Sequence, residues 1–261
     1  MILDQINYEN LLIPLNKFYD IHIGGPRRPI FHDIAKTRPE LLALDRDWRV
    51  IRDELLAILP DKASIPKYHE LDRMQYPISG RVDPDKAWKV FPMNIMGVKP
   101  RAYCDRCPKT SALLDTIPGL FEAFFSILEG GKSIPHHEGP YRGYLRYHLG
   151  LVVPEVDPPS IRLKDQVYTW KEGESVLFDD SWDHEVYNTC KQDRVVLIVD
   201  IRRPMPMPFD AVNRVAQAIM KPVYGRHILK QLAAAELPGA VRPAAQAPAT
   251  SEEGRPVTSG A

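Results

Sequence analysis

The feature that most constrains the fold is a series of seven short apolar segments in the second half of the chain, separated by turns rich in Gly, Pro and Asp. The segments cover residues 123–128, 144–153, 160–164, 166–170, 175–179, 184–188 and 194–201. Short strands at such spacing are typical of a β-sandwich or barrel. The high proline count, 25 against 15 glycines, also favours a turn-rich β fold over a helical bundle.

The segment 144–151 shows which face of this sheet is polar. Leu145, Tyr147, Leu149 and Leu151 alternate along it with Arg146, His148 and Gly150. Because successive side chains of a strand point to opposite faces, one face is apolar and the other carries groups that bind anions or metals. A polar inner face in a small barrel predicts a ligand cavity.

Helices are expected around this β region. Apolar residues recur at three- and four-residue steps over 38–59, which predicts one amphipathic helix: Leu41, Leu44, Trp48, Ile51, Leu55 and Ile58. A strand is expected over 87–96. A second helix is expected to start at Pro108 and to stop at Pro118-Gly119. The prediction is therefore a mainly β domain with flanking helices over 38–205.

The two ends of the chain are expected to lie outside this domain. Residues 1–37 read as an irregular segment that wraps it. Residues 206–235 read as amphipathic helices, broken at Pro222 and Gly225, which dock on the barrel or contact a membrane surface or a second copy. Residues 236–261 lack aromatic residues and are rich in Ala, Pro, Ser, Gly and Glu, so a disordered tail is expected.

Composition limits the partners and the compartment. Lys plus Arg and Asp plus Glu both number 34, so nothing indicates a nucleic-acid partner. Three cysteines argue against a disulfide framework, and Cys104-x-x-Cys107 has no second pair with which to bind zinc. The N-terminus lacks a basic region and no apolar run reaches the ~20 residues of a membrane span, so a cytoplasmic protein without a transmembrane segment is expected.

Two polar motifs carry the chemistry, PHHEGPYRGYLRYHLGL at 135–151 and FDDSWDHEVYN at 178–188. Together with the strand that follows them, they supply His136, His137, Glu138, Arg146, His148, His184 and Arg194. Imidazoles suit Fe, Zn, Cu or Ni, and arginine binds carboxylates through two hydrogen bonds. A metal and a carboxylate bound side by side are what a 2-oxoglutarate-dependent iron oxygenase needs.

These motifs, with TWKEGES before the second and RVVLIVDIRRP after it, resemble the aspartyl/asparaginyl β-hydroxylase family, which also contains lipid A acyl-chain hydroxylases. The resemblance covers roughly residues 38–205. It implies an Fe(II)- and 2-oxoglutarate-dependent dioxygenase that consumes O2 and has a double-stranded β-helix (jelly-roll, cupin-like) core.

The resemblance also implies roles for individual residues. His137 and His184 would be the iron ligands and thus the catalytic residues. Ser126, Arg146, His148 and Arg194 would contact 2-oxoglutarate. Asp179 and Asp180 are expected to cap a turn or to orient His184 rather than to bind the metal.

One position departs from the usual two-histidine, one-carboxylate site. Gly139 stands where the carboxylate of an HxD/E motif would follow His137. The aspartyl/asparaginyl hydroxylases also lack that carboxylate. An alternative register, in which His136-x-Glu138 forms the HxE motif, stays open.

Three alternative functions follow from these features. The leading expectation, favoured by the glycine, is hydroxylation at the β-carbon of an Asp or Asn residue in a peptide or protein. The amphipathic stretch 208–232 favours an acyl chain of a membrane lipid, with peripheral membrane contact through that stretch. A non-catalytic cupin-like metal-binding module would use the same histidine pair without oxygen chemistry.

Overall fold

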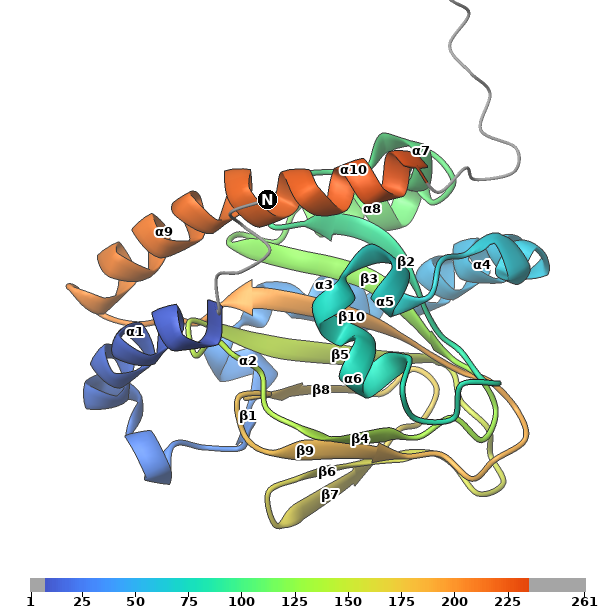
Figure 1. The fold of residues 1–261 in the computed structure, drawn as a ribbon, viewed down its shortest axis with the longest axis horizontal. Helices are drawn as coiled ribbons and strands as arrows, with labels where there is room; N and C mark the ends of the chain where they lie inside the picture. The colour runs from blue at the N-terminus through green and yellow to red at the C-terminus, as the bar shows by residue number, and fades with distance from the viewer. Residues whose placement is uncertain (1–7, 235–261) are drawn as a thin grey trace, which may run out of the picture.

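Two antiparallel sheets form the body of the protein (Figure 1). The computed structural model describes residues 8–234. The larger sheet has the order β1 (Phe31–His32), β8 (Ser175–Phe178), β5 (Tyr144–Val152), β10 (Arg194–Arg202), β3 (Leu120–Leu128) and β2 (Trp88–Ile95). The smaller sheet has the order β4 (Ile134–His137), β9 (His184–Tyr187), β6 (Ser160–Leu163) and β7 (Gln166–Thr169).

The chain passes back and forth between these sheets. From β3 it crosses to β4, returns to β5, crosses to β6 and β7, returns to β8, crosses to β9 and ends on β10. Consecutive strands in alternate antiparallel sheets are the topology of a double-stranded β-helix, so the predicted jelly-roll fold is confirmed.

All seven strands expected between 123 and 201 are present, as is the strand expected at 87–96. Two strands were missed, β1 and β4. β1 has only two residues, and β4 reads Ile-Pro-His-His, which has neither the alternation nor the β-branched residues that mark a strand in sequence.

The apolar face of β5 is the outer face of the larger sheet, and helices cover it. Leu145, Tyr147 and Leu149 are fully buried there. α4 (Trp48–Ile58) packs on β5, and Arg52 Nε donates to the carbonyl of Leu151 at 3.0 Å. α8 (Pro108–Asp115) is the helix predicted to start at Pro108, and it lies beside α4 and packs on β3.

The prediction of a single helix over 38–59 is wrong. The segment divides into a 3-10 turn (Pro39–Leu41), α3 (Leu42–Arg46) and α4, followed by a second 3-10 turn (Leu59–Ser64). α3 and α4 meet at Asp47, whose φ of −100° and ψ of 19° lie outside the helical region. Short helices occupy the connections before and after β2: α5 (Tyr68–Leu71), α6 (Tyr76–Ser79) and α7 (Arg101–Cys104).

The N-terminal segment was expected to be irregular, but it contains two helices. Tyr8–Ile23 forms α1, followed by a 3-10 turn (Gly25–Arg27) and, after β1, by α2 (Ile34–Thr37). Asn16 on α1 binds the loop after β4, donating to the Pro140 carbonyl at 2.8 Å and accepting from the Arg142 amide at 3.0 Å.

The C-terminal helices follow β10. α9 (Phe209–Met220) runs through a π-helical turn (Lys221–Gly225) into α10 (Arg226–Ala234), so Pro222 and Gly225 lie in an irregular turn rather than in a gap (Figure 1). Ile228 and Leu232 anchor α10 in the hydrophobic core. The tail predicted at 236–261 lies outside the described residues. Between residues 8 and 234, no helix has both the length and the apolar character that crossing a bilayer requires.

Candidate active site

Two histidines face each other across the β4–β9 pair. His137 and His184 are direct register partners, and their ring centroids lie 4.1 Å apart. The Nδ1 atoms of His137 and His184 each lie 2.9 Å from a backbone carbonyl, of Pro135 and Trp182 respectively. Since a carbonyl can only accept, Nδ1 is the protonated nitrogen in both rings. Each Nε2 therefore keeps a lone pair that a metal can use.

Burial keeps both rings neutral. It lowers the pKa of His137 to about 3, with a further contribution from His184, and the pKa of His184 to about 4. Neutral imidazoles are the form that binds a metal ion. The pair therefore fits a metal with open coordination positions, although the described residues contain no group of three or more His, Cys, Asp and Glu side chains arranged to hold one.

The alternative register is not favoured by the structure. The His136 side chain is 77% exposed and lies beside Asp183, with Nδ1 3.4 Å from the carboxylate. Glu138 is also exposed. Both therefore point away from His184, whereas His137 faces it.

A carboxylate occupies the space beside Gly139. A Cβ added to Gly139 would lie 2.7 Å from Oδ1 of Asp180, so no side chain fits there without a shift. The Gly139 amide donates to the Asp180 carbonyl at 2.9 Å, which holds the two backbones together. Asp180 is buried, and its Oδ1 has no hydrogen-bond partner in the described structure.

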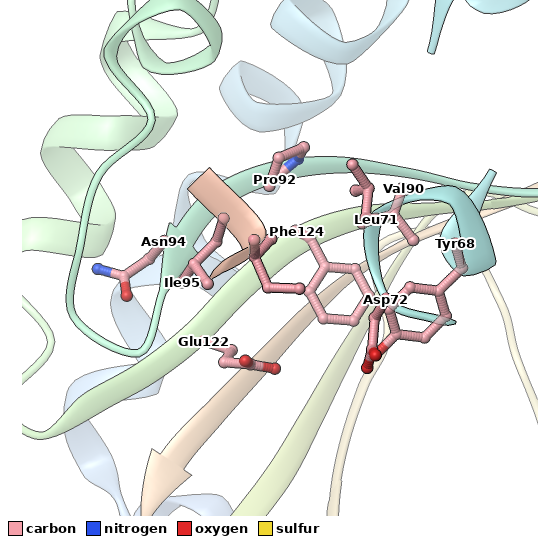
Figure 2. A pocket seen from close by; sticks show the side chains of 10 residues that line it. Tyr68, Leu71, Asp72, Val90, Pro92, Asn94, Ile95, Glu122 and Phe124 are labelled. Carbon is pink, nitrogen blue, oxygen red and sulfur yellow. The ribbon is translucent and has the colours of Figure 1, made fainter. Parts of the chain in front are cut away.

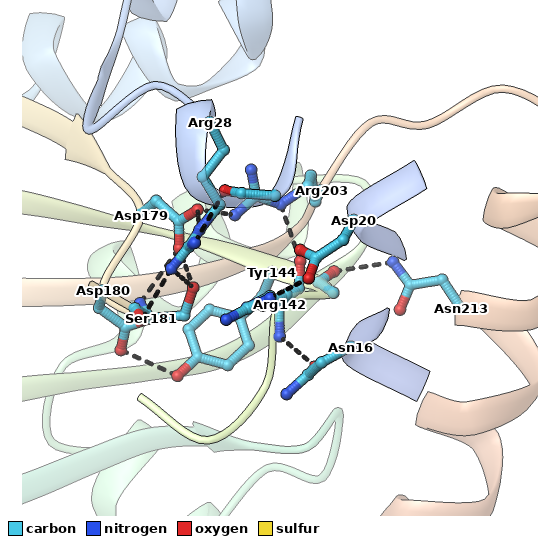
Figure 3. A network of polar contacts seen from close by, with 12 residues as sticks. Asn16, Asp20, Arg28, Arg142, Tyr144, Asp179, Asp180, Ser181, Arg203 and Asn213 are labelled. Carbon is cyan, nitrogen blue, oxygen red and sulfur yellow. Dashed lines mark hydrogen bonds and ion pairs between the residues drawn. The ribbon is translucent and has the colours of Figure 1, made fainter. Parts of the chain in front are cut away.

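Asp179 points to the opposite side of the sheet and closes the turn before His184 (Figure 3). Its Oδ1 accepts from the amide of Ser181 at 3.1 Å and from the Ser181 hydroxyl at 2.6 Å. Its Oδ2 lies 3.0 Å from Arg28 Nε and 2.6 Å from Arg203 Nη2. These contacts outweigh the cost of burial and lower the pKa of Asp179. The expected turn-capping role of Asp179 agrees with this geometry.

Arg194 is a buried guanidinium without a carboxylate partner among the described residues. It is 1% exposed, its Nε has no hydrogen-bond partner, and its Nη1 lies 3.5 Å from the Ser126 hydroxyl. Its guanidinium carbon lies 4.4 Å from the centre of the Trp170 ring. Burial lowers the pKa of Arg194 to about 9, so the group remains a cation at neutral pH and lacks an anion.

Ser126 and His148 lie on the same face as Arg194. Ser126 accepts from Trp88 Nε1 at 2.9 Å. His148 stacks on Trp170, with ring centroids 5.8 Å apart, and both of its ring nitrogens lack partners in the described residues. Burial, and then the charges of Arg146 and Arg194, lower its pKa well below the usual value.

Arg146 lies on the same face but is already paired. Its Nε and Nη2 each lie 2.7 Å from the Asp200 carboxylate, and its Nη1 lies 3.0 Å from Asp180. Tyr144 also donates to Asp180, at 2.9 Å. The structure thus brings the predicted residues to the space between the sheets, but gives Arg146 two carboxylate partners that the sequence analysis did not identify.

Three residues of this region were missed: Asp200, Trp170 and Glu122. Asp200 could have been found, because it lies six residues after Arg194 and an even spacing puts both side chains on one face of β10. Glu122 was missed because β3 begins at Leu120, three residues before the expected start.

A profile of the aspartyl/asparaginyl beta-hydroxylases matches residues 45–204, more than half of the chain. The chain belongs to this family. The family assignment made from the two motifs is therefore confirmed.

Two relatives show the range of this family. The ornithine lipid ester-linked acyl 2-hydroxylase of Rhizobium tropici is 40% identical over 192 residues, which are 73% of this chain and 66% of that protein. The human aspartyl/asparaginyl beta-hydroxylase is 33% identical over 171 residues, 64% of this chain and 21% of the human protein. The chain thus spans only part of each relative.

Among solved structures, a Pseudomonas putida prolyl-4-hydroxylase aligns with a TM-score of 0.40 at 17% identity. The alignment covers 60% of this chain and 88% of that protein.

Proposed function

We propose that this protein is an Fe(II)- and 2-oxoglutarate-dependent hydroxylase. The observation that carries the proposal is the pairing of two neutral, opposed histidines with the buried, unpaired guanidinium of Arg194 between the same two sheets. The histidines suit a metal with open positions, and the guanidinium suits a carboxylate. Membership of a family of hydroxylases supports the same activity.

Each side chain then has a role. His137 and His184 would hold Fe(II) through Nε2, while their Nδ1–H groups keep the rings in position. Arg194 and Ser126 would bind the distal carboxylate of 2-oxoglutarate, and Trp170 would exclude water from that contact. Iron bound here would supply the coupled oxidation, in which O2, 2-oxoglutarate and a C–H bond give succinate, carbon dioxide and an alcohol.

The contacts of Arg146 and His148 with 2-oxoglutarate remain predictions. Arg146 shares two carboxylates, so Arg194 is the better carboxylate anchor. His148 has two unpartnered ring nitrogens on the sheet face that carries Arg194, and it would lie beside the co-substrate.

For the substrate we propose an acyl chain of a membrane lipid. Exposed apolar side chains gather on α1, on α9 and in the loop before α9, namely Ile13, Ile21, Met207, Val215 and Ile219. α1 and α9 pack together through Phe18 and Phe209, with ring centroids 4.7 Å apart. Exposed Lys17 and Lys221 add positive charge, which suits an anionic membrane. The acyl 2-hydroxylase named above is consistent with this choice.

The β-carbon of an Asp or Asn residue is the second candidate. Gly139 supports it, because the missing carboxylate is shared with the aspartyl/asparaginyl hydroxylases, and so does the human relative.

The test of the activity is conversion of 2-oxoglutarate to succinate by the full chain with Fe(II), measured by mass spectrometry. His184→Ala should abolish it, since one of two protein ligands is lost. His136→Ala is the matched control, because His136 is the exposed neighbour of the proposed ligand and should leave turnover intact. Full turnover by His184→Ala would refute the assignment. Bound iron without turnover in the wild type would favour the non-catalytic binding module.

A further inference from the structure

Two cavities in the described part of the protein differ in what they can hold. One, between α5, β2, β3 and α10, has a volume of about 30 Å³, which leaves room for about one water molecule (Figure 2). The other has a volume of about 180 Å³. An apolar cavity of roughly 150 Å³ holds a benzene molecule, so the larger of these two cavities can accept a small ligand group.

The larger cavity lies on the outer face of the larger sheet. Its walls come from the C-terminal end of α1, from β1, from the end of α2, from the start of β5 and from the residues after β10. Leu145 lines it and alternates with Arg146 along β5, so the cavity and the proposed iron site lie on opposite faces of the sheet.

The polar groups that line this cavity can all donate hydrogen bonds. They are the guanidinium of Arg203, the imidazoles of His22 and His32, and the hydroxyl of Thr37. None of the described residues in the lining is acidic. A lining with a cation, several donors and no carboxylate suits an anion.

Arg203 provides the positive charge. Its side chain is buried, its Nε donates to the Arg142 carbonyl at 2.8 Å, and its Nη2 lies 2.6 Å from the Asp179 carboxylate. Arg28 contacts the same carboxylate at 3.0 Å, so two guanidinium groups share one negative charge (Figure 3). These contacts of Arg203 use Nε and Nη2, which leaves the two N–H groups of Nη1 for a ligand. A bound anion would balance the second guanidinium.

His32 brings a second donor to the same cavity. Its Nε2 atom is buried and has no hydrogen-bond partner among the described residues. Burial, and then the charge of Arg203, lower the pKa of His32 to about 4, so the ring is neutral and keeps one N–H group. An unpartnered buried polar atom is costly to a fold. An anion held by Arg203 would remove this cost by accepting from the Nε2–H tautomer of His32.

The cavity borders the apolar surface of α1 and α9. Ile21, which is 75% exposed, directly precedes His22 in the cavity wall. Met207, which is 73% exposed, lies three residues after Pro204 in the same wall. The ring of His22 stacks on Phe209 of α9, with ring centroids 5.4 Å apart. Exposed apolar side chains beside a cationic cavity suit a membrane surface, where lipid tails lie next to phosphate groups.

We infer that this cavity binds the phosphate group of a membrane lipid. The phosphate oxygens would accept from Arg203 and His32, while the exposed apolar side chains of α1 and of the loop before α9 enter the lipid layer. The inference goes beyond the proposed function, because the site lies on the other face of the sheet and would hold the protein at the membrane without touching the reacting groups.

A soluble head group tests the cavity. Glycerol 3-phosphate is titrated by calorimetry into the full-length protein, as wild type, as Arg203→Lys, as His22→Glu and as Gln166→Glu. Arg203→Lys removes the planar donor fork, and His22→Glu places a carboxylate at the exposed edge of the cavity without altering the buried cluster. Gln166→Glu is the matched control, because it adds the same charge on exposed β7.

Wild type and Gln166→Glu should bind glycerol 3-phosphate equally. Arg203→Lys and His22→Glu should bind it about tenfold or more weakly, the factor expected for a charge-assisted hydrogen bond. His22→Glu keeps the test decisive if Arg203→Lys does not fold. Absence of binding by the wild type, or equal affinity of His22→Glu and the wild type, would overturn the inference. The measurement needs neither iron nor 2-oxoglutarate, so its outcome is separate from that of the proposed function.

A vesicle experiment tests the lipid as the source of the phosphate. Phosphatidylcholine vesicles that contain phosphatidic acid, whose head group is the same phosphate, are co-sedimented with each protein at constant ionic strength. His22→Glu should partition about tenfold or more weakly than the wild type and Gln166→Glu, and saturating glycerol 3-phosphate should release the wild type. Unchanged partition of His22→Glu would identify a soluble phosphate compound as the ligand, and an equal loss in Gln166→Glu would identify non-specific charge repulsion. Either result would overturn the inference.

Discussion

Arg194 shows how a single side chain can favour function at the expense of the fold. Its guanidinium is almost fully buried and stacks on Trp170, and the Ser126 hydroxyl is its one hydrogen-bond contact among the described residues. A buried charge without a counter-charge destabilises the folded state. The proposed co-substrate would bring the missing anion.

Arg194→Met should accordingly separate stability from co-substrate binding. We expect the ligand-free variant to unfold at or above the wild-type temperature, because an unpaired buried charge is replaced by an apolar group of similar length. With Fe(II) under nitrogen, a hundredfold excess of 2-oxoglutarate over its Kd should stabilise the wild type by about 3 kcal/mol and leave the variant unchanged. Thermal unfolding with and without 2-oxoglutarate measures both effects.

Arg214→Met is the control, since Arg214 is exposed on α9 and should leave the 2-oxoglutarate effect intact. An Arg194→Met protein that still responds to 2-oxoglutarate would exclude Arg194 as the carboxylate anchor.

For individual residues, the sequence predicted the face on which Arg146 and His148 lie, but not their partners. Alternation along β5 correctly places Arg146 and His148 on the polar face. That Asp200 lies opposite Arg146 depends on the register between β5 and β10, which no local pattern encodes. The partners of Arg146 therefore required the structure.

Among the elements, one buried ionic cluster joins three separate parts of the chain. Arg28, after the 3-10 turn at Gly25–Arg27, and Arg203, after β10, both contact Asp179 in the turn after β8 (Figure 3). Arg28 also donates to the Ser181 carbonyl at 2.8 Å, and Arg203 donates to that of Arg142 at 2.8 Å. The cluster fixes the turn that leads to His184.

Asp179→Asn should therefore be strongly destabilising. The substitution leaves two buried guanidinium groups with no carboxylate between them, a change that typically costs about 3–5 kcal/mol. Urea unfolding followed by circular dichroism measures the loss. Asp165→Asn, in the exposed turn between β6 and β7, should change the free energy of unfolding by less than about 0.5 kcal/mol. A similarly small effect for Asp179→Asn would contradict the role given to the cluster.

The helices show where a periodic pattern stops being informative. Leu41, Leu44, Ile51 and Leu55 are all buried, so the apolar spacing continues across the break at Asp47. Both α3 and α4 bury their apolar side chains in the same core, and a pattern that records only burial cannot show a change of direction between them. The strands were easier to predict, because each is bounded by turn residues.

In the whole molecule, α1 and α9 lie next to each other, and each carries two large exposed apolar side chains: Ile13 and Ile21 on α1, and Val215 and Ile219 on α9 (Figure 1). Val215 and Ile219 are 59% and 62% exposed and lie four residues apart, on one face of α9. α10 continues α9 end to end and is anchored in the core by Ile228 and Leu232, so this face belongs to a helix that is held at its C-terminal end (Figure 1).

The double variant Val215→Asp/Ile219→Asp should bind anionic lipid vesicles at least about tenfold more weakly than the wild type, because two apolar contacts are lost and two negative charges are added. Co-sedimentation with vesicles at low salt measures the partition. Val156→Asp is the control, since Val156 is 77% exposed in a loop away from both helices. Equal partition of the double variant and the wild type would count against a lipid surface as the partner of α9.

The contact between Gly139 and Asp180 has a consequence for how this site can change over evolutionary time. A Cβ at position 139 and the carboxylate at position 180 compete for the same volume. A lineage could therefore gain an acid at 139 only if the side chain at 180 became smaller or moved. The two positions form a linked pair, in which an acid at 139 alone is disfavoured and the paired change leads from a two-histidine site to a histidine–carboxylate site.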